Sequence, residues 1–215
     1  MAARVKICGI KTAEAMAAAL EARADLIGLV FFPPSPRSLT LDEAMPLADY
    51  ARGNAAIVAL VVDADDTLLD SIVSAINPDL LQVHGSETPE RVAHIRERFG
   101  KPVMKAIKVA TIDDARTALA YRDVADLVLF DAKPPPGADR PGGHGVAFDW
   151  SVLADVREQV PFMLSGGLTP DTVAAAIRAT GATVVDVSSG VESAPGVKDP
   201  ELIRAFIRAA KGAPI

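Results

Sequence analysis

The sequence predicts an α/β protein, a single-domain (β/α)8 TIM barrel with a parallel sheet of eight strands. Short runs rich in Val, Ile and Leu alternate with alanine-rich helical patterns along the chain, which favours parallel βα units over hairpins. The runs number eight, and the last helical pattern can cover the first strand, as a closed barrel requires. The alternative is an open doubly wound sheet, which needs fewer strands.

Length, charge and cysteine count narrow the class of protein. The 215 residues, half of them apolar, predict one domain over residues 1–215 with a substantial core. The net charge of −6, without a Lys/Arg block, argues against nucleic acid as a partner. A single cysteine excludes an internal disulfide, and neither a membrane-spanning stretch nor a signal peptide stands out. We expect a cytoplasmic protein without a membrane partner, a monomer rather than a homodimer.

The eight predicted strands are short and apolar: Val5–Cys8, Leu26–Phe31, Ala56–Val62, Leu80–Val83, Val103–Ile107, Leu127–Phe130, Phe162–Leu164 and Val184–Val187. Helical patterns begin near Thr12, Leu41, Asp66, Thr88, Thr111, Asp149, Pro170 and Asp199. Several of them start with a capping residue, such as Thr12, Thr88, Thr111 or Asp199. Thr169 is expected to cap the seventh helix, with Pro170 at its first position.

Two loops of small residues follow the seventh and eighth strands. Gly166 and Gly167 let backbone amides come close to a ligand and tolerate positive φ. Ser188, Ser189 and Gly190 offer hydroxyls and amides after the eighth strand. A tight strand-to-helix turn would also explain the glycine pair. Two such loops after strands seven and eight of a barrel nevertheless favour a phosphate site, helped by the helix that follows the glycines.

The first strand ends in a thiol. Chemistry in a barrel lies at the carboxyl ends of the strands, so Cys8 is either a candidate base or an ordinary buried cysteine. Lys6, two residues earlier, shares its face of the strand. Its ammonium would favour the Cys8 thiolate. Alternatively, Lys6 fills the barrel interior while paired to a carboxylate.

Three further side chains follow strands two, four and six. Arg37 lies in a loop stiffened by three prolines, which suits bidentate recognition of a carboxylate; the alternative is a solvated surface arginine. His84 is either a structural or a catalytic imidazole. Asp131 directly follows an apolar run, and a carboxyl partly removed from water suits a general acid near neutral pH. A structural aspartate that caps the next loop is the other interpretation.

The stretch 132–148 has neither helix nor strand pattern, and its glycines would let it close over a ligand.

No spacing typical of a metal site, P-loop or nucleophile elbow occurs, so we expect neither metal nor cofactor. The residues alone predict proton-transfer chemistry on a phosphorylated small molecule, with Cys8 as base, Asp131 as acid and Arg37 as anion reader.

A set of motifs in a fixed order resembles the phosphoribosylanthranilate isomerase family. The motifs are Lys6-Ile7-Cys8-Gly9-Ile10, Gly28-Leu-Val-Phe-Phe with Ser35-Pro36-Arg37, Leu81-Gln82-Val83-His84-Gly85, Leu129-Phe130-Asp131, Ser165-Gly166-Gly167-Leu168 and Asp186-Val187-Ser188-Ser189-Gly190-Val191-Glu192. Each motif is weak alone, but the ordered set is specific and covers almost the whole chain. Val83 stands where the family usually has leucine, a minor departure.

The resemblance implies a (β/α)8 barrel and a place in tryptophan biosynthesis. It implies the Amadori rearrangement of N-(5-phosphoribosyl)anthranilate to 1-(2-carboxyphenylamino)-1-deoxyribulose 5-phosphate. Asp131 would protonate the furanose oxygen, Cys8 would remove the C2 proton, and Arg37 would hold the anthranilate carboxylate. Asp186, His84 and Lys6 are further candidates for substrate contact. The implied phosphate residues are Gly166, Gly167, Ser188, Ser189 and Gly190.

Two rival functions are weighed against this one. An indole-glycerol-phosphate synthase-like lyase would use a lysine acid, for which Lys105 and Lys108 are available, although the Cys8/Asp131 pair and the chain length disfavour it. A non-catalytic phosphosugar-binding module would also need the phosphate loops. Such a module has no need for a thiol and a carboxyl at two separate strand ends, and it should tolerate Cys8→Ser.

Overall fold

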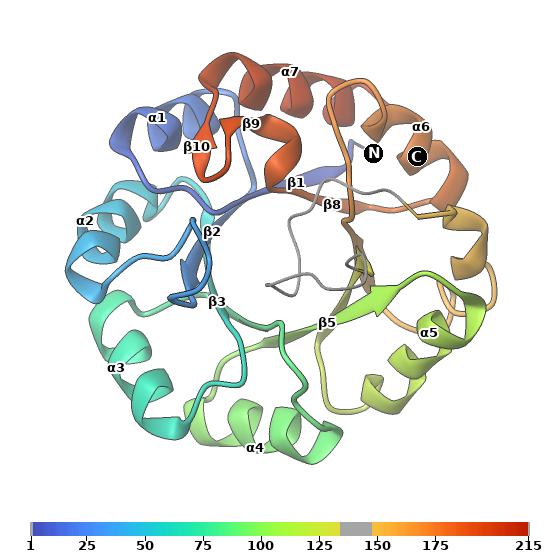
Figure 1. Ribbon diagram of the computed structural model, residues 1–215, viewed down its shortest axis with the longest axis horizontal. Helices are drawn as coiled ribbons and strands as arrows, with labels where there is room; N and C mark the ends of the chain where they lie inside the picture. The colour runs from blue at the N-terminus through green and yellow to red at the C-terminus, as the bar shows by residue number, and fades with distance from the viewer. Residues whose placement is uncertain (1, 134–147, 215) are drawn as a thin grey trace.

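The computed structural model describes residues 2–133 and 148–214 and contains a closed barrel of eight parallel strands in sequential order. Figure 1 looks down this ring of strands, with helices around it. The predicted fold is confirmed. The strands are β1 (Arg4–Cys8), β2 (Leu26–Phe31), β3 (Ala56–Val61), β4 (Leu80–Val83), β5 (Val103–Val109), β6 (Leu127–Ala132), β7 (Phe162–Leu164) and β8 (Val184–Val187). Within the predicted loop 132–148, residues 134–147 lie outside the described part of the chain.

The helices that surround the barrel are α1 (Ala13–Glu21), α2 (Leu41–Ala51), α3 (Asp66–Ile76), α4 (Pro89–Phe99), α5 (Ile112–Arg116), α6 (Val173–Thr180) and α7 (Pro200–Lys211). The predicted caps at Thr12, Thr88, Thr111 and Asp199 are confirmed, since each side chain accepts a hydrogen bond from a backbone amide of the first turn. After β8, a short antiparallel hairpin follows, formed by β9 (Glu192–Ala194) and β10 (Val197–Lys198).

The predicted start of the seventh helix was wrong. The helix begins at Val173 instead of Pro170. The Thr169 amide donates to the Thr172 hydroxyl over 2.9 Å, and the two threonine hydroxyls lie 3.1 Å apart. This side-chain turn replaces the first helical turn, because threonine hydroxyls compete with the backbone for such bonds.

Two other helical predictions correspond to shorter elements. The pattern from Asp149 forms only a 3₁₀ turn, Trp150–Leu153, which Asp149 caps through Ser151. The pattern from Thr111 gives a helix that ends at Arg116 and continues as a 3₁₀ segment, Thr117–Tyr121. Strand β6 continues to Ala132, so Asp131 lies inside the strand and not just after it.

The barrel interior changes from apolar to polar along its axis. The buried cluster near the starts of the strands comprises Leu26, Val58, Met104, Ala106, Leu129 and Met163. Nearer the carboxyl ends come buried polar side chains, among them Lys6, Gln82, His84, Asp131 and Asp186. Packing therefore fills one end of the barrel and leaves the carboxyl ends of the strands for chemistry.

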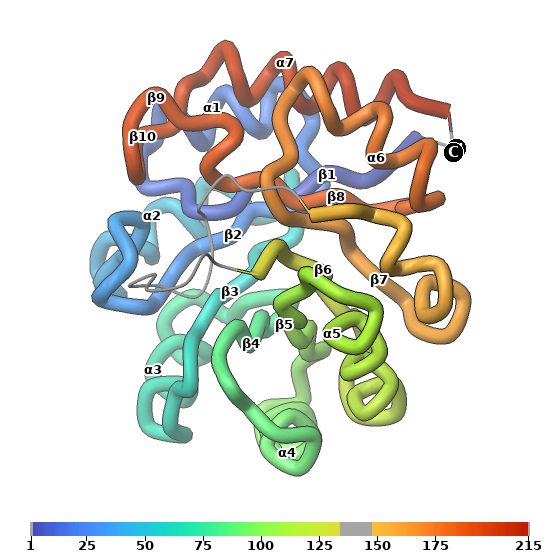
Figure 2. Tube along the Cα trace, turned by 45° about the vertical axis from the view of Figure 1, so that its right-hand side comes forward, coloured from blue at the N-terminus to red at the C-terminus, as the bar shows by residue number. Residues whose placement is uncertain are grey.

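Helix α7 closes the ring as the sequence predicts. Its buried face presents Ile203, Phe206 and Ile207, and the helix packs against α1 and β1. Figure 2 shows α7 and α1 next to each other, although they lie at opposite ends of the chain. Each of these large side chains contributes about 1.5–3 kcal/mol by its burial.

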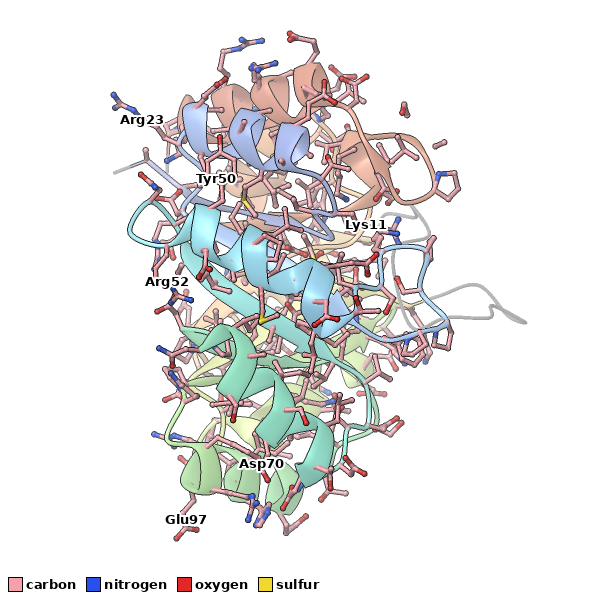
Figure 3. All side chains as sticks on the ribbon, turned by 90° about the vertical axis from the view of Figure 1, so that its left-hand side faces the viewer. Lys11, Arg23, Tyr50, Arg52, Asp70 and Glu97 are labelled. Carbon is pink, nitrogen blue, oxygen red and sulfur yellow. The ribbon has the colours of Figure 1, made fainter. Side chains whose placement is uncertain are left out.

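The helices run along the barrel, so the two ends of the helical layer mark the two ends of the barrel. Figure 3 shows α1, α2 and α3 side by side, with Lys11 at one end of the layer and Arg23 and Arg52 at the other. Lys11, just after β1, donates to the carbonyl of Pro36 over 3.0 Å and so joins the β1 and β2 loops at the carboxyl end. No helix in the described ranges has the length and apolarity needed to cross a membrane.

A buried ion pair between Lys105 and Glu87 ties strand β5 to the loops that follow β3 and β4. Met104 and Ala106 face the interior, so Lys105 between them points toward the helices. Its ammonium donates to Glu87 Oε2 and to the Gly85 carbonyl, both over 2.7 Å. Glu87 in turn accepts from the amides of Asp63 and Gly85. Lys105 is therefore not available as the lysine acid of the rival lyase.

We expect Lys105→Met to lower the free energy of unfolding by about 3–5 kcal/mol, because the Glu87 carboxylate is left buried without its counter-ion. Burial alone would raise the pKa of Glu87, but the Lys105 charge and several hydrogen bonds lower it overall. The pair's contribution is thus present above the ordinary glutamate pKa and is lost as the pH falls through the lowered one. Urea unfolding at neutral pH measures the effect, with Lys101→Met as control, a half-buried lysine whose ammonium binds the neutral Asn77 side chain instead of a carboxylate. A loss below 1 kcal/mol would contradict this account.

Candidate active site

The Cys8 thiol lies at the end of β1, against β2. Gly28 is its partner on β2, and a Cβ atom at Gly28 would stand 2.9 Å from Cys8 Sγ. The absence of a side chain at Gly28 thus makes room for the thiol. Burial raises the pKa of Cys8, and the charges of Lys6 and Lys198 offset this only in part. Lys6 thus acts in the expected direction, since its ammonium lowers the pKa of the thiol, but desolvation is the larger effect and the pKa is raised overall.

Lys6 is paired with Asp186 across the β1–β8 seam. The two residues are register partners, and Lys6 Nζ donates to Asp186 Oδ1 over 2.8 Å. The second Asp186 oxygen accepts from Ser165 Oγ over 2.9 Å. Burial alone would lower the pKa of the fully buried Lys6, but Asp186 and Cys8 raise it above its ordinary value. Of the two interpretations of Lys6, the paired interior lysine is the one observed.

The Asp131 carboxyl lies at the end of the barrel interior next to His84. Its Oδ1 accepts from the Ala132 amide over 2.9 Å, and its Oδ2 lies 3.3 Å from His84 Nε2. His84 Nδ1 lies 2.9 Å from the side-chain nitrogen of Gln82. The structure thus brings together two predicted residues, Asp131 and His84, and adds Gln82, which no pattern in the sequence marks as a site residue.

Arg37 is buried, so the alternative of a solvated surface arginine was wrong. Its Nε and Nη2 donate to the two oxygens of Glu192, both over 2.7 Å. Glu192 also accepts from Lys198 over 2.7 Å. Burial alone would lower the pKa of Arg37, but Glu192 raises it, with smaller contributions from Cys8 and Asp131. The Arg37 side chain also packs against Gly9, since a Cβ atom there would stand 2.6 Å from Arg37 Cδ, and so it lies next to the residue that follows Cys8.

Glu192 and Lys198 are site residues that the sequence reasoning missed. Both belong to the hairpin after β8, and Gly196 in that hairpin packs against the carbonyl of Pro36 in the loop that carries Arg37. Lys198 is 2% exposed in its side chain and also donates to the Ser188 carbonyl over 2.9 Å. The hairpin had no hydrophobic periodicity that could reveal it; only Glu192, the last residue of a quoted motif, gave a signal.

The glycine pair in the first of the two loops proposed for phosphate has the positive φ that its sequence allows. Gly166 and Gly167 have φ of 86° and 65°, in the region that favours glycine. A Cβ atom at Gly166 would come within 2.6 Å of the Ala132 amide nitrogen, just past Asp131. On the other side, Ser188 Oγ donates to the Cys8 carbonyl over 3.2 Å. Both loops thus lie beside strands that carry candidate catalytic groups, and Ser189 and Gly190 open a 3₁₀ turn.

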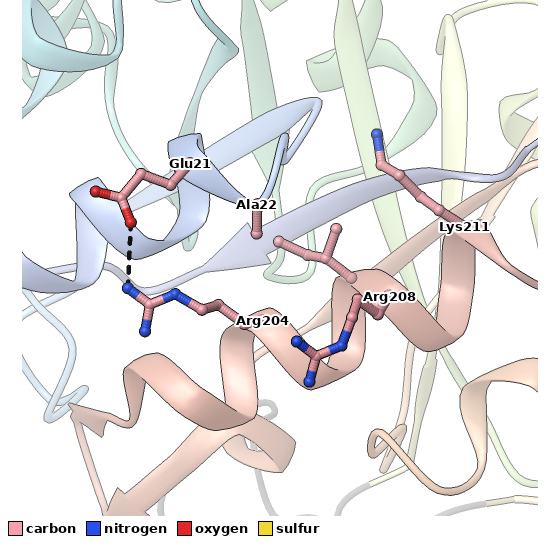
Figure 4. A pocket seen from close by; sticks show the side chains of 6 residues that line it. Glu21, Ala22, Arg204, Arg208 and Lys211 are labelled. Atoms are coloured by element: carbon pink, nitrogen blue, oxygen red, sulfur yellow. Dashed lines mark hydrogen bonds and ion pairs between the residues drawn. The ribbon is translucent and has the colours of Figure 1, made fainter.

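A separate pocket of about 430 Å³ lies between α1 and α7 on the outer layer, as Figure 4 shows. Arg204 on its wall pairs with Glu21 over 3.2 Å and with Glu201 over 2.8 Å. Lys211 pairs with Asp25 over 3.0 Å. Because this pocket lies on the helical layer, away from the carboxyl ends of the strands, we do not assign the chemistry to it. Among residues 2–133 and 148–214, no group of three or more metal-binding side chains occurs.

A closed (β/α)8 barrel with a thiol, a carboxyl and an arginine gathered at the carboxyl ends of its strands has the architecture of a barrel enzyme. Residues 5–209 match the family model of N-(5'-phosphoribosyl)anthranilate isomerase. The chain belongs to this family.

Individual relatives agree with the family model. The N-(5'-phosphoribosyl)anthranilate isomerase of Rhodopseudomonas palustris (strain BisA53) is 60% identical over 207 residues, covering 96% of this chain and 95% of that protein. The crystal structure of phosphoribosylanthranilate isomerase from Thermotoga maritima matches with a TM-score of 0.88 and 36% identity, covering 98% and 99% of the two chains. Another phosphoribosylanthranilate isomerase structure, in complex with reduced 1-(o-carboxyphenylamino)-1-deoxyribulose 5-phosphate, matches with a TM-score of 0.86 and 34% identity, with the same coverage.

Proposed function

We propose that the chain converts N-(5-phosphoribosyl)anthranilate into 1-(2-carboxyphenylamino)-1-deoxyribulose 5-phosphate, an Amadori rearrangement in tryptophan biosynthesis, with Asp131 as acid and Cys8 as base. One observation carries the assignment of roles: Cys8 at the end of β1 and Asp131 in β6 are both buried at the carboxyl end of one closed barrel, and the Arg37 side chain packs against Gly9, just past Cys8. The family membership and the relative solved with a reduced product support the reaction.

In the first step, the Asp131 carboxyl donates its proton to the furanose ring oxygen. The bond between that oxygen and C1 breaks, and the anthranilate nitrogen supplies its electron pair to form a C1=N double bond. Asp131 is left as a carboxylate, whose oxygens are next to the Ala132 amide and His84 Nε2. Positioned donors of this kind stabilise the charge as it develops.

In the second step, Cys8 as thiolate removes the proton from C2. The electrons of the C2–H bond form a C1=C2 double bond and return the C1=N electrons to nitrogen, which gives an enolamine that tautomerises to the ketone. Cys8 and Asp131 must therefore act in opposite protonation states, a division of roles that their different surroundings support. A thiol whose pKa is raised by burial is a strong base once it has lost its proton.

Binding of the two anionic ends of the substrate is assigned to separate groups. The phosphate would lie between Gly166, Gly167 and the residues Ser188, Ser189 and Gly190, as in other barrels with a phosphate site after strands seven and eight. Arg37 would bind the anthranilate carboxylate. Since Glu192 occupies the Nε/Nη2 side of the guanidinium, the substrate would take the Nη1/Nη2 end, which also offers two parallel N–H groups.

We expect Arg37→Lys to raise KM about 10- to 100-fold, the effect of losing a hydrogen bond to a charged group, with a smaller change in kcat. Lysine keeps the charge, but its ammonium lacks the two N–H edges with which a guanidinium can bind Glu192 and a second carboxylate at the same time. Steady-state kinetics measure the effect, and Arg52→Lys at the opposite end of the barrel is the matched control. An unchanged KM would remove Arg37 from the carboxylate site.

A direct test of the function is growth without tryptophan. A bacterial strain that lacks its own phosphoribosylanthranilate isomerase should grow on minimal medium when it carries this chain. It should fail to grow when it carries the Cys8→Ser or Asp131→Asn variant at equal expression. Growth failure with the wild-type chain, despite folded protein, would contradict the proposal.

The organisation of the protein is also a proposal. We propose that residues 1–215 act as one barrel domain and that the protein is a cytoplasmic monomer. The single cysteine and the net charge of −6 support this. Light scattering on the purified protein tests the oligomeric state, and a mass of two chains would contradict the monomer.

A further inference from the structure

We propose that Gln82 is a positioning residue that fixes the tautomer of His84, so that the His84 Nε2–H group faces the Asp131 carboxyl. The catalytic part of this inference rests on the proposed role of Asp131 as the acid. The part that concerns the tautomer does not depend on that role, because it follows from the contacts of Gln82 and His84 alone.

The donor at Gln82 determines the proton position on His84. The Gln82 side-chain nitrogen lies 2.9 Å from His84 Nδ1, and both residues are buried. An amide nitrogen can only donate, so Nδ1 must accept and carries no proton. A neutral imidazole then holds its proton on Nε2, the nitrogen that points away from Gln82.

The protonated nitrogen lies beside the candidate acid. His84 Nε2 is 3.3 Å from Asp131 Oδ2, while Asp131 Oδ1 accepts from the Ala132 amide over 2.9 Å. The Nε2 contact is not yet an aligned hydrogen bond, since Nε2 has no such partner among the described residues. When Asp131 gives its proton to the sugar, negative charge develops on its oxygens, and this contact can tighten. The opposite tautomer would direct a lone pair at the carboxylate.

The position of Gln82 in the core supports a specific role. Its neighbours across the sheet are Leu60 on β3 and Met104 on β5. Its side-chain oxygen is buried without a hydrogen-bond partner in the described part of the chain, which costs free energy. A leucine or methionine would fill such a layer without that cost. The Gln82 amide therefore packs no better than an apolar side chain would at this position. What only the amide provides is the contact to His84.

Nitrogen-15 NMR of the imidazole rings tests the tautomer directly. The chain has three histidines, so His94→Gln and His144→Gln identify the His84 signals by difference. We expect, at about pH 8, where an ordinary histidine is neutral, an unprotonated Nδ1 and a protonated Nε2. A protonated Nδ1, alone or together with Nε2, would overturn the proposal whether or not the protein is active.

Two substitutions at Gln82 test the effect on catalysis. Gln82→Glu keeps the size but accepts where the amide donates, so the His84 proton should move to Nδ1. Gln82→Met removes the donor. We expect kcat to fall about tenfold in each, as for one lost hydrogen bond, with KM within twofold. The exposed Gln159→Glu is the matched control.

The outcomes separate the two proposals. Unchanged kcat and an unchanged His84 tautomer in both folded Gln82 variants would refute the positioning role. A wild-type protein that shows the expected tautomer but does not isomerise phosphoribosylanthranilate would refute the proposed function instead, and the catalytic part of the inference with it.

Discussion

Replacement of Asp131 by asparagine is expected to lower kcat by about 10²–10⁴-fold, the usual contribution of a positioned general acid. Asparagine has nearly the same shape and can still contact the Ala132 amide, but it has no acidic proton for the ring oxygen. KM should change little, because the phosphate and carboxylate of the substrate are assigned to other residues. Steady-state kinetics with the purified variant measure both constants.

The control for this variant is Asp123→Asn, which alters an exposed carboxylate near the start of β6. It should leave both constants unchanged. Near-normal turnover by Asp131→Asn would show that the proton comes from another group. A large rise in KM with an unchanged kcat would instead make Asp131 a binding residue.

Replacement of Cys8 by serine should lower kcat by a similar factor of about 10²–10⁴. The serine hydroxyl hardly ionises near neutral pH and therefore cannot take the C2 proton. The hydroxyl is no larger than the thiol, so the tight space beside Gly28 is respected. Affinity for a reduced product analogue should persist, which separates an isomerase from a phosphosugar-binding module. A variant that keeps wild-type turnover would exclude the thiolate as the base.

The pH dependence of the wild type provides a second test of Cys8. Burial raises the pKa of the thiol, so the neutral form predominates near pH 7 and the thiolate increases as the pH rises. We therefore expect alkylation of Cys8, the single cysteine, by iodoacetamide to become faster as the pH rises above neutrality. A rate that is already constant from pH 7 upward would contradict the raised pKa.

Much of the barrel could be predicted because its signals are local. Eight short apolar runs gave the strand count, and threonine or aspartate caps gave helix starts that the structure confirms at Thr12, Thr88, Thr111 and Asp199. The prediction failed at Thr169, where two threonine side chains bond each other and delay the helix. Such a choice between backbone and side-chain partners is nearly balanced in energy, so a cap-like residue alone does not decide it.

The partners of the candidate site residues could not be predicted, because they are distant in sequence. Arg37 binds Glu192, 155 positions away, and Lys6 binds Asp186, 180 positions away. Only closure of the barrel places β1 beside β8 and the hairpin after β8 beside the β2 loop. The net pKa of Cys8 could not be predicted for a related reason: the sequence shows the lysine that lowers it but not the depth of burial that outweighs this charge.

The most direct test of the central claim is the decay of substrate fluorescence when the purified protein meets phosphoribosylanthranilate prepared free of magnesium, with EDTA present throughout. The wild type and the Cys8→Ser and Asp131→Asn variants are compared at equal concentration. Acid and base catalysis by these two side chains predicts rapid decay with the wild type and very slow decay with either variant. Decay no faster than the spontaneous rate with the wild type, or equally rapid decay with a variant, would contradict it.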